Sequence, residues 1–240
     1  MGCAPGCHRC NQESIVTCFM IRIYLWKIEN RYIPWAIARM ALDRISLWRM
    51  KNISFWKLLG AGKGETFTPR DADPRRWGLL VVIDPQTIST LENSALLQRW
   101  RRRSTSEYSA DLSPISVHGE WSRRTPFAEI PLVDRNWSGP IAAITRARIK
   151  WRKNFIFWRS VPPVTRSLHN SEGLIAAIGI GEAPVGLQGT FSVWTSSDAV
   201  KNFAYRGEAH KAAIAATHRE EWYAEEMFAR FAVTRSSGDL

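Results

Sequence analysis

Four cysteines stand near the beginning of the chain, and three of them have a spacing that could hold an iron–sulfur cluster. Cys3, Cys7 and Cys10 follow the pattern C-x3-C-x2-C, which radical-SAM enzymes use for this purpose. In those enzymes the motif follows a strand inside a barrel, whereas here it lies in a Gly- and Pro-rich stretch at the chain start. We therefore interpret residues 1–18, with Cys18 at the end, as a flexible N-terminal tail with incidental thiols.

Other familiar catalytic motifs are missing from the sequence. The phrase GAGKGE (60–65) fits neither G-x-x-x-x-G-K-[ST] nor G-x-G-x-x-G, so it does not predict a nucleotide site. The sequence contains no H-E-x-x-H and no G-x-S-x-G. It therefore gives no support to a hydrolase.

The charge and the tryptophan content are both unusual. The chain carries a net charge of +11 and twelve tryptophans among 240 residues. A basic surface attracts nucleic acid or an anionic membrane face, and tryptophan suits flat ring systems and the lipid headgroup zone. No run of apolar residues reaches the roughly 18 needed to span a bilayer, and the start lacks the apolar core of a secretory signal. We expect a cytoplasmic protein, and a peripheral position on the inner face of the membrane stays open.

The first half of the chain alternates between strand and helix patterns. β-Branched and aromatic residues predict strands around 18–27, at 53–62 and at 77–84, and an extended stretch at 107–121. A helix is predicted at 85–100, with Pro85 in its first turn. Another is predicted at 33–49, with one apolar face made of Ile33, Ile37, Met40, Ala41, Ile45 and Trp48.

The pattern then repeats after a segment rich in Arg, Pro, Asp and Asn. Residues 19–121 form one predicted half, 122–138 a linker and 139–240 the second half. In the second half we expect strands at 139–151, 173–182, 189–196 and 227–235, and helices at 154–169 and 196–222. Glycine turns at 60–62 and 179–181 occupy equivalent places. The sequence thus predicts an α+β fold in which duplicated ferredoxin-like repeats form a dimeric-α/β-barrel-like body.

Longer phrases carry a resemblance to a known family. The chain resembles the spheroidene monooxygenases in order from about residue 33 to residue 233. The phrases are FWKLLGAGKGETF (55–67), SVHGEWSRRTPF (116–127), GPIAAITRARI (139–149), FWRSVPPV (157–164), IGIGEAPVGLQGTFSVW (178–194) and AHKAAIAATHREEWYAEEMFARF (209–231). The most specific are TFSVW and WYAEEMFARF.

The resemblance implies an oxidoreductase of carotenoid biosynthesis. Such a monooxygenase would use haem iron, molecular oxygen and an electron donor such as reduced ferredoxin to place a keto group at C-2 of an acyclic carotenoid, as in spheroidene to spheroidenone. A polyene dissolves in membranes, which would explain a basic, tryptophan-rich, membrane-associated surface.

A haem oxygenase requires an axial ligand, and the resemblance singles out one of the five histidines. His210 lies in a family-like block and is followed by small residues that a flat macrocycle can approach closely. It is the predicted metal ligand, with His218 and His118 as alternatives. His8 lies in the tail and His169 precedes a turn. A His210 that only caps a helix remains open.

Arginines and tryptophans complete the expected site. Alternation along 139–151 puts Arg146, Arg148 and Lys150 on one face, where Arg146 and Arg148 could bind the haem propionates or form a solvated or lipid-facing basic edge. The matching phrases FWK and FWR suggest pocket residues in both halves, although core packing of the tryptophans is the competing interpretation. These residues are Trp56, Lys57, Trp158 and Arg159.

Two other functions stay open. A relative could bind haem yet act on another apolar substrate. A basic single-stranded nucleic-acid-binding protein is the rival from a different class, supported by the RWRRR run (99–103). The aromatic strand motif of RNA-binding ferredoxin-like domains is missing, so no nucleic acid is expected as a partner.

Overall fold

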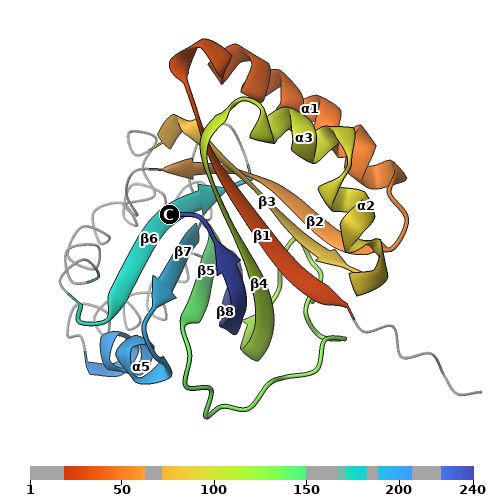
Figure 1. Cartoon of the computed structure of the whole chain (residues 1–240). Helices are drawn as coiled ribbons and strands as arrows, with labels where there is room; N and C mark the ends of the chain where they lie inside the picture. The colour runs from red at the N-terminus through yellow and green to blue at the C-terminus, as the bar shows by residue number, and fades with distance from the viewer. Residues whose placement is uncertain (1–18, 63–71, 150–167, 169–170, 183–188, 207–222) are drawn as a thin grey trace, which may run out of the picture.

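The computed structural model describes residues 19–62, 72–149, 168, 171–182, 189–206 and 223–240 (Figure 1). Apart from short 3-10 turns, the first half contains β1 (Met20–Ile28), α1 (Ile33–Arg49), β2 (Ile53–Gly62), β3 (Ala72–Ile83), α2 (Ile88–Glu92), α3 (Ala95–Arg101) and β4 (Ser104–Gly119). The second half contains β5 (Ile141–Ile149), β6 (Leu174–Gly181), β7 (Gly189–Trp194), α5 (Ser197–Arg206) and β8 (Tyr223–Ser237).

The strands close into one antiparallel barrel, in the order β1-β3-β2-β6-β7-β5-β8-β4. The first half contributes the order β4-β1-β3-β2 and the second half the order β8-β5-β7-β6, which is the same arrangement with every number raised by four. The edges of the halves meet where β2 pairs with β6 and β4 with β8. The predicted duplicated ferredoxin-like α+β fold is therefore confirmed, and closure leaves no free sheet edge.

The glycine phrases of the two halves meet at one of these seams. Gly60 pairs with Gly181, and Ala61 pairs with Ile180. The strands predicted at 53–62 and 173–182 include these glycines and are confirmed, whereas the description of the glycines as turns is wrong, because they continue β2 and β6 to their last residues. Their predicted equivalence agrees with this pairing, since equivalent residues of a repeat can meet at the interface between its copies.

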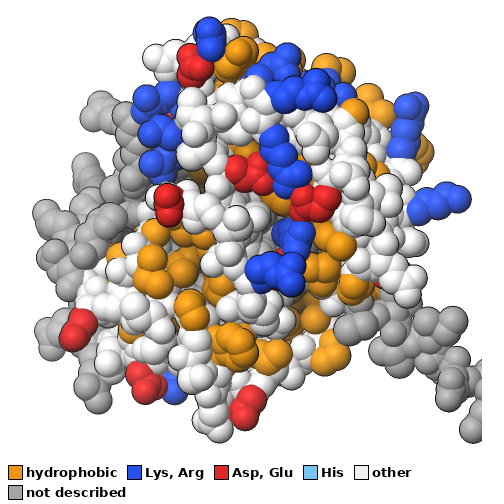
Figure 2. All heavy atoms as spheres, in the orientation of Figure 1, with side chains coloured by type: hydrophobic (Ala, Val, Ile, Leu, Met, Phe, Trp, Pro, Cys, Tyr) orange, Lys and Arg blue, Asp and Glu red, His pale blue; other side chains and the backbone are white. Residues whose placement is uncertain are grey.

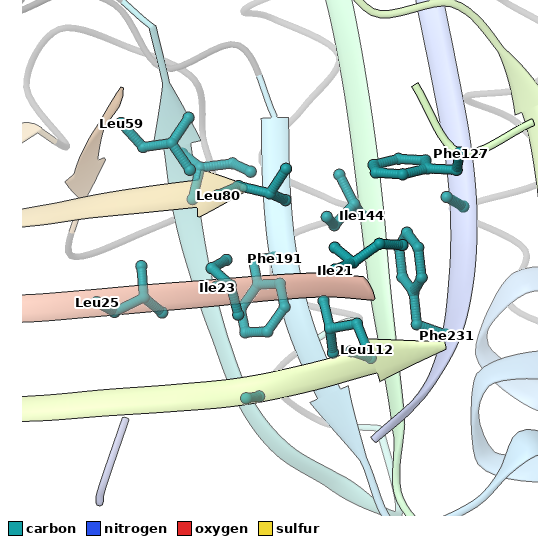
Figure 3. Packing of buried hydrophobic residues seen from close by; sticks show 14 of the residues in the cluster. Ile21, Ile23, Leu25, Leu59, Leu80, Leu112, Phe127, Ile144, Phe191 and Phe231 are labelled. Carbon is teal, nitrogen blue, oxygen red and sulfur yellow. The ribbon is translucent and has the colours of Figure 1, made fainter. Parts of the chain in front are cut away.

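The barrel interior is filled by apolar side chains from every strand (Figure 3). On β1 these are Ile21, Ile23 and Leu25, which alternate with residues on the outer face. The predicted linker also contributes to this core, because Phe127 and Ile130 are buried in it. Residues 122–138 thus form more than a connection: part of the segment packs inside the barrel that the two halves share.

Helices α1 and α3 cover the outer face of β1, β2 and β3 and enclose a second core (Figure 1). The bounds of α1 agree with the predicted helix, but the predicted buried face is wrong. Ile37, Ile45 and Trp48 are 50%, 51% and 79% exposed. The residues of α1 that are buried are Ala36, Asp43 and Leu47.

The rotation of α1 is set by a buried carboxylate. Asp43 is completely buried and accepts hydrogen bonds from the indole N–H of Trp100 at 2.9 Å and from the guanidinium groups of Arg99 and Arg39. A buried carboxylate is tolerated only with such partners. Because they lie on α3 and on α1 itself, Asp43 must face the protein, and the helix face opposite to it is turned outward.

The single helix predicted at 85–100 is divided into three pieces. A 3-10 turn at Pro85–Thr87 precedes α2, and Asn93 and Ser94 separate α2 from α3. The hydroxyl of Ser94 accepts a hydrogen bond from the backbone N–H of Leu97 and caps α3. The interruption lets Glu92 contact Arg22, Tyr24 and Arg101 from the end of α2.

The N-terminal cysteines and the possibility of a membrane-spanning helix were both considered from the sequence. All four cysteines lie at 1–18, outside the described residues. Within the described ranges, none of the helices has the length and apolar character required to pass through a bilayer.

Candidate functional site

Four charged side chains meet at the end of the barrel where β4 and β6 finish and β8 begins. This barrel-end cluster consists of Lys57, Arg146, Glu182 and Glu225. Arg146 donates to Glu182 through Nη2 at 2.7 Å and through Nε at 3.0 Å, and its Nη1 donates to Glu225. Lys57 donates to the second oxygen of Glu182 at 2.6 Å. Two positive and two negative charges therefore neutralise one another.

Strand alternation explains why Arg146 lies inside. Ala142 and Ile144 point into the barrel core, so Arg146 follows on the same face of β5 and is only 2% exposed. A guanidinium at such a position requires carboxylates, because its desolvation is otherwise costly. All three of its nitrogens bind carboxylates, which engages three of the five N–H groups of the guanidinium.

The segment that follows β4 is bound to this cluster. The indole N–H of Trp121 donates to Glu182 at 2.6 Å, and the guanidinium carbon of Arg146 lies 5.4 Å from the centre of the Trp121 ring. The hydroxyl of Ser122 accepts a hydrogen bond from Lys57 at 2.5 Å. Residues from five separate parts of the chain thus share one set of hydrogen bonds.

Glu225 also stabilises an unfavourable backbone turn. Ser122 and Arg123 have φ values of 56° and 58°, in the left-handed region that non-glycine residues avoid. Their backbone N–H groups donate to the two oxygens of Glu225 at 2.9 and 2.8 Å. One carboxylate therefore binds both the turn and Arg146, and offsets a strain of about 1–3 kcal/mol per residue.

The environment keeps both glutamates ionised. Burial of Glu182 opposes its ionisation, but the hydrogen bond from Lys57 and the charge of Arg146 outweigh burial, so its pKa is lowered. For Glu225, burial is likewise outweighed by the backbone N–H groups of Ser122 and Arg123 and by Arg146, and its pKa is also lowered. Neither carboxylate is suited to accept a proton at neutral pH.

The space beside the cluster is small. Its volume is about 10 Å³, which is room for about one water molecule. It is lined by Leu59, Trp121, Arg146, Ile180, Gly181 and Glu182. The barrel-end cluster therefore closes the barrel rather than opening it to a large ligand.

The lowered pKa values predict how acid affects the fold. A carboxylate with a depressed folded-state pKa adds stability that is present above its unfolded value near 4.5 and is lost as the pH falls below it. Unfolding by urea at several pH values should show a free energy that falls below about pH 4.5. The Glu182→Gln variant should be less stable than wild type at pH 7, with a difference that shrinks on acidification. A difference that is constant with pH would contradict this assignment.

Two of the predicted pocket residues face opposite sides of β2. Lys57 points into the barrel and joins the cluster, whereas Trp56 packs on the outer side with the guanidinium of Arg44 5.8 Å from its ring centre. Neighbours in a strand cannot line the same space. Trp158 and Arg159 lie outside the described residues.

The predicted propionate donors differ in their surroundings. Arg146 binds Glu182 and Glu225 through all three of its nitrogens, whereas Arg148 is exposed and has no ion pair with another described residue. Of the histidines, only His118 lies in the described ranges, and it is exposed on β4 opposite Phe228. The predicted ligand His210 and the histidines at 8, 169 and 218 lie outside them.

The RWRRR run serves the fold rather than a free basic surface. Trp100 is buried, Arg99 pairs with Asp43, and Arg101 pairs with Glu92 and Glu107. The main sequence feature behind the nucleic-acid hypothesis is thus largely taken up by internal contacts.

The outer face of the second half differs from that of the first. On β1 and β3 the outward residues are large, as in Trp26, Trp77 and Leu79. On the second half, two cross-strand rows consist mainly of small residues. They are Ala177, Ser192 and Ala143 in one row, and Gly179, Thr190 and Thr145 in the next.

These rows continue onto β8 and β4, where larger residues begin. Ala143 is followed by Arg230 and Ser116, and Thr145 by Phe228 and His118. Arg230 is half-buried and donates from Nε to the hydroxyl of Ser116 at 2.9 Å. The small residues of the two rows on β5, β6 and β7 form a flat surface, here called the platform. The guanidinium of Arg230 lies at its side.

Sequence reasoning missed Arg230 and the partners of Arg146. Alternation could have placed Arg230, because Ala229 and Phe231 on either side point inward. For Arg146 the signal is different. An arginine on the inward face of a strand indicates that a buried carboxylate must pair with it. No local pattern, however, identifies Glu182 or Glu225 as that carboxylate.

Comparison with solved structures supports the fold. Aldoxime dehydratase in complex with butyraldoxime has a TM-score of 0.53 at 11% identity, covering 91% of this chain and 80% of that one. A second aldoxime dehydratase structure has a TM-score of 0.51 at 12% identity, covering 90% and 81%. At such low identity the similarity establishes the architecture alone.

Comparison with characterised sequences is more specific. No protein-family model matches the chain. The spheroidene monooxygenase of Rhodobacter capsulatus is 33% identical, over 86% of this chain and 86% of its own length. The enzyme of Rubrivivax gelatinosus is 35% identical, over 82% of this chain and 75% of its own length. That of Cereibacter sphaeroides is 31% identical, over 85% of this chain and 63% of its own length. With this identity extending over most of both chains, the protein belongs to the spheroidene monooxygenase family.

Proposed function

We propose that the protein is a carotenoid monooxygenase that converts the C-2 methylene of an acyclic carotenoid into a ketone, with haem as cofactor and a reduced protein such as ferredoxin as electron donor. The observation that carries the proposal is the identity to three spheroidene monooxygenases over most of the chain.

The reaction balances as two successive monooxygenations of one carbon. In each, one oxygen atom of O2 is inserted into a C–H bond to give a hydroxyl group, and the other leaves as water after taking up two electrons from the donor protein and two protons from solvent. The resulting geminal diol loses water to give the ketone. The protein must therefore hold the end of a long apolar chain in place and keep water away from it.

The two faces of the barrel fit a haem group differently. The barrel interior is filled by side chains, and the space beside the barrel-end cluster is about 10 Å³. On the outer face of the second half the residues of β5, β6 and β7 are small, so a flat ring can approach the sheet closely, although Ser192 and Gly179 are buried there and Ala177 packs against a core that includes Val200 of α5. We infer that haem binds over this platform and, when bound, activates oxygen for the reaction.

Residues of the second half would hold the group. His210 remains the proposed iron ligand. Arg230 and Arg148 are the proposed partners of the propionates, because Arg230 borders the platform and Arg148 has no competing ion pair with a described residue. Arg146 acts indirectly in this proposal, since its two carboxylate partners fix the strand that carries Arg148.

Haem binding can be measured without any carotenoid. Purified protein titrated with haem should develop a Soret band that shifts on reduction and on addition of carbon monoxide. His210→Ala should abolish the ligated spectrum, and Arg230→Gln should weaken binding about 10–100-fold, as expected for a charge-assisted hydrogen bond. Arg135→Gln, an exposed arginine of the 122–138 segment, is the control and should bind as wild type does. Folded protein that binds no haem would refute the cofactor.

The substrate is tested by expression in a bacterium that accumulates spheroidene. The extracted pigment should gain one oxygen and lose two hydrogens, with its absorption shifted to longer wavelength by conjugation of the new carbonyl. An unchanged pigment in cells that contain the folded, haem-loaded protein would instead favour another apolar substrate.

A further inference from the structure

Helix α1 packs Trp35, Ala36, Met40 and Leu47 against the protein, yet it also carries four large apolar side chains on its outer face. Its residues Ile37, Leu42, Ile45 and Trp48 are 50%, 50%, 51% and 79% exposed. They account for four of the seven large apolar side chains that are exposed among the described residues. A surface helix normally turns such residues inward, so this arrangement requires an explanation beyond folding.

The contacts beneath α1 hold this orientation firmly. Asp43 is buried against Trp100, Arg99 and Arg39, and Leu47 and Ala36 pack into the core beneath the helix. Rotating the apolar residues inward would expose Leu47 and break the bonds of Asp43. The outward apolar face is therefore built into the fold.

The charges around this face are almost all positive. Arg44 and Arg49 are exposed on α1, and the only acid of the helix, Asp43, is buried. Arg31 and Lys51 flank its two ends, and Glu29 is paired with Arg31. In Figure 2, hydrophobic and Lys or Arg side chains lie next to one another along the upper edge of the molecule, where Figure 1 shows α1.

We propose that the outer face of α1 docks on the surface of an anionic lipid bilayer. An interfacial helix of this kind lies in the membrane plane, with apolar side chains in the acyl boundary and basic ones at the phosphates. Trp48 has the amphipathic ring that is enriched at the headgroup level. Arg44 and Arg49, which are exposed and form no ion pair with a described residue, match the negative potential of such a surface.

Charge also argues against a second copy of the chain as the occupant. Two such faces packed against each other would bring Arg44 and Arg49 of one copy towards the same arginines of the other. Like charges at an interface are unfavourable. An anionic bilayer satisfies both the apolar and the basic side chains.

The proposal is tested by co-sedimentation of the full-length protein with vesicles that contain no carotenoid. Wild type should bind phosphatidylglycerol-containing vesicles and bind pure phosphatidylcholine vesicles much more weakly, with an affinity that falls as salt rises. The triple variant Ile37→Ser/Ile45→Ser/Trp48→Ser should bind at least about tenfold more weakly, because its apolar contact with the acyl region is lost. Arg44→Gln/Arg49→Gln should lower the affinity for anionic vesicles by about fivefold per arginine.

The control places the same kind of change elsewhere. Leu132 is 59% exposed in the 122–138 segment and Ile175 is 56% exposed on β6, so Leu132→Ser/Ile175→Ser removes apolar surface away from α1. This variant should bind vesicles as wild type does. All the substituted side chains are largely exposed, so thermal unfolding of every variant should stay close to wild type.

Three results would overturn the proposal. The first is wild-type protein that fails to sediment with anionic vesicles, and the second is a triple variant that binds as well as wild type. A wild-type dimer that the triple variant dissociates would assign this face to self-association. None of these results depends on haem or carotenoid, so the proposed function is judged separately.

Discussion

Replacing Arg146 with alanine is expected to lower the free energy of unfolding by about 3–5 kcal/mol, the range found when one partner of a buried ion pair is removed. Arg146 is almost fully buried and is bound to Glu182 and Glu225, which lie on different strands or at their ends. Without the guanidinium, Glu225 loses its only ion-pair partner among the described residues while still carrying its charge. Equilibrium unfolding in urea measures the loss.

Two further variants identify its cause. Arg148→Ala removes an exposed arginine two positions along the same strand and should change stability by less than about 0.5 kcal/mol. Arg146→Met/Glu225→Gln removes the guanidinium together with the charge left behind and should recover part of the loss. If the single and double variants are equally unstable, the loss comes from packing rather than from an unpaired carboxylate.

Replacing Trp121 with alanine is expected to cost about 3–5 kcal/mol, as for other large buried aromatic residues. Trp121 is 1% exposed, and its ring contacts Phe55 and Arg146 while its N–H donates to Glu182. Trp121 is the last residue of the first predicted half, and an exposed residue at such a boundary would cost less than about 0.5 kcal/mol on substitution. The expected loss therefore measures how tightly this boundary is packed.

A second substitution separates the contribution of the Trp121 ring to stability from that of its N–H group. Trp121→Phe keeps most of the apolar volume and loses the hydrogen bond to Glu182, so it should cost about 1.5–3 kcal/mol, the usual contribution of a hydrogen bond to a charged group. Trp48→Ala is the matched control, because the same residue type is 79% exposed on α1 and its loss should barely change stability. A tolerated Trp121→Ala would mean that the end of the barrel is not closed by this segment.

If both predictions hold, the barrel-end cluster stabilises the fold and does not take part in proton transfer. Its glutamates are kept ionised by their partners, and each nitrogen of its arginine binds a carboxylate. The functional part of the second half would then be the outer platform and the residues around it. Arg146 then has a structural role and Arg148 a role in ligand binding, although strand alternation in the sequence places both on one face.

Local sequence patterns determined which elements exist and that they occur twice. The residues of α1 and β2 were predicted with the bounds observed, because helical and strand periodicity depend on neighbours a few positions apart. The duplication followed from comparing the order of elements in the two halves, and the family followed from phrases such as TFSVW. The split of the 85–100 helix escaped prediction because a serine cap competes only weakly with a continuous helical pattern.

Tertiary structure alone decided the surroundings of each functional candidate. Arg146 finds its carboxylates 36 and 79 positions away in the chain, and Asp43 finds Trp100 57 positions away. Periodicity shows that two faces of an element differ but not which face meets the protein, and for α1 one buried carboxylate reversed the expected choice. Pairing between distant residues depends on the closed barrel, in which β2 meets β6 and β4 meets β8, and short-range sequence patterns do not encode that closure.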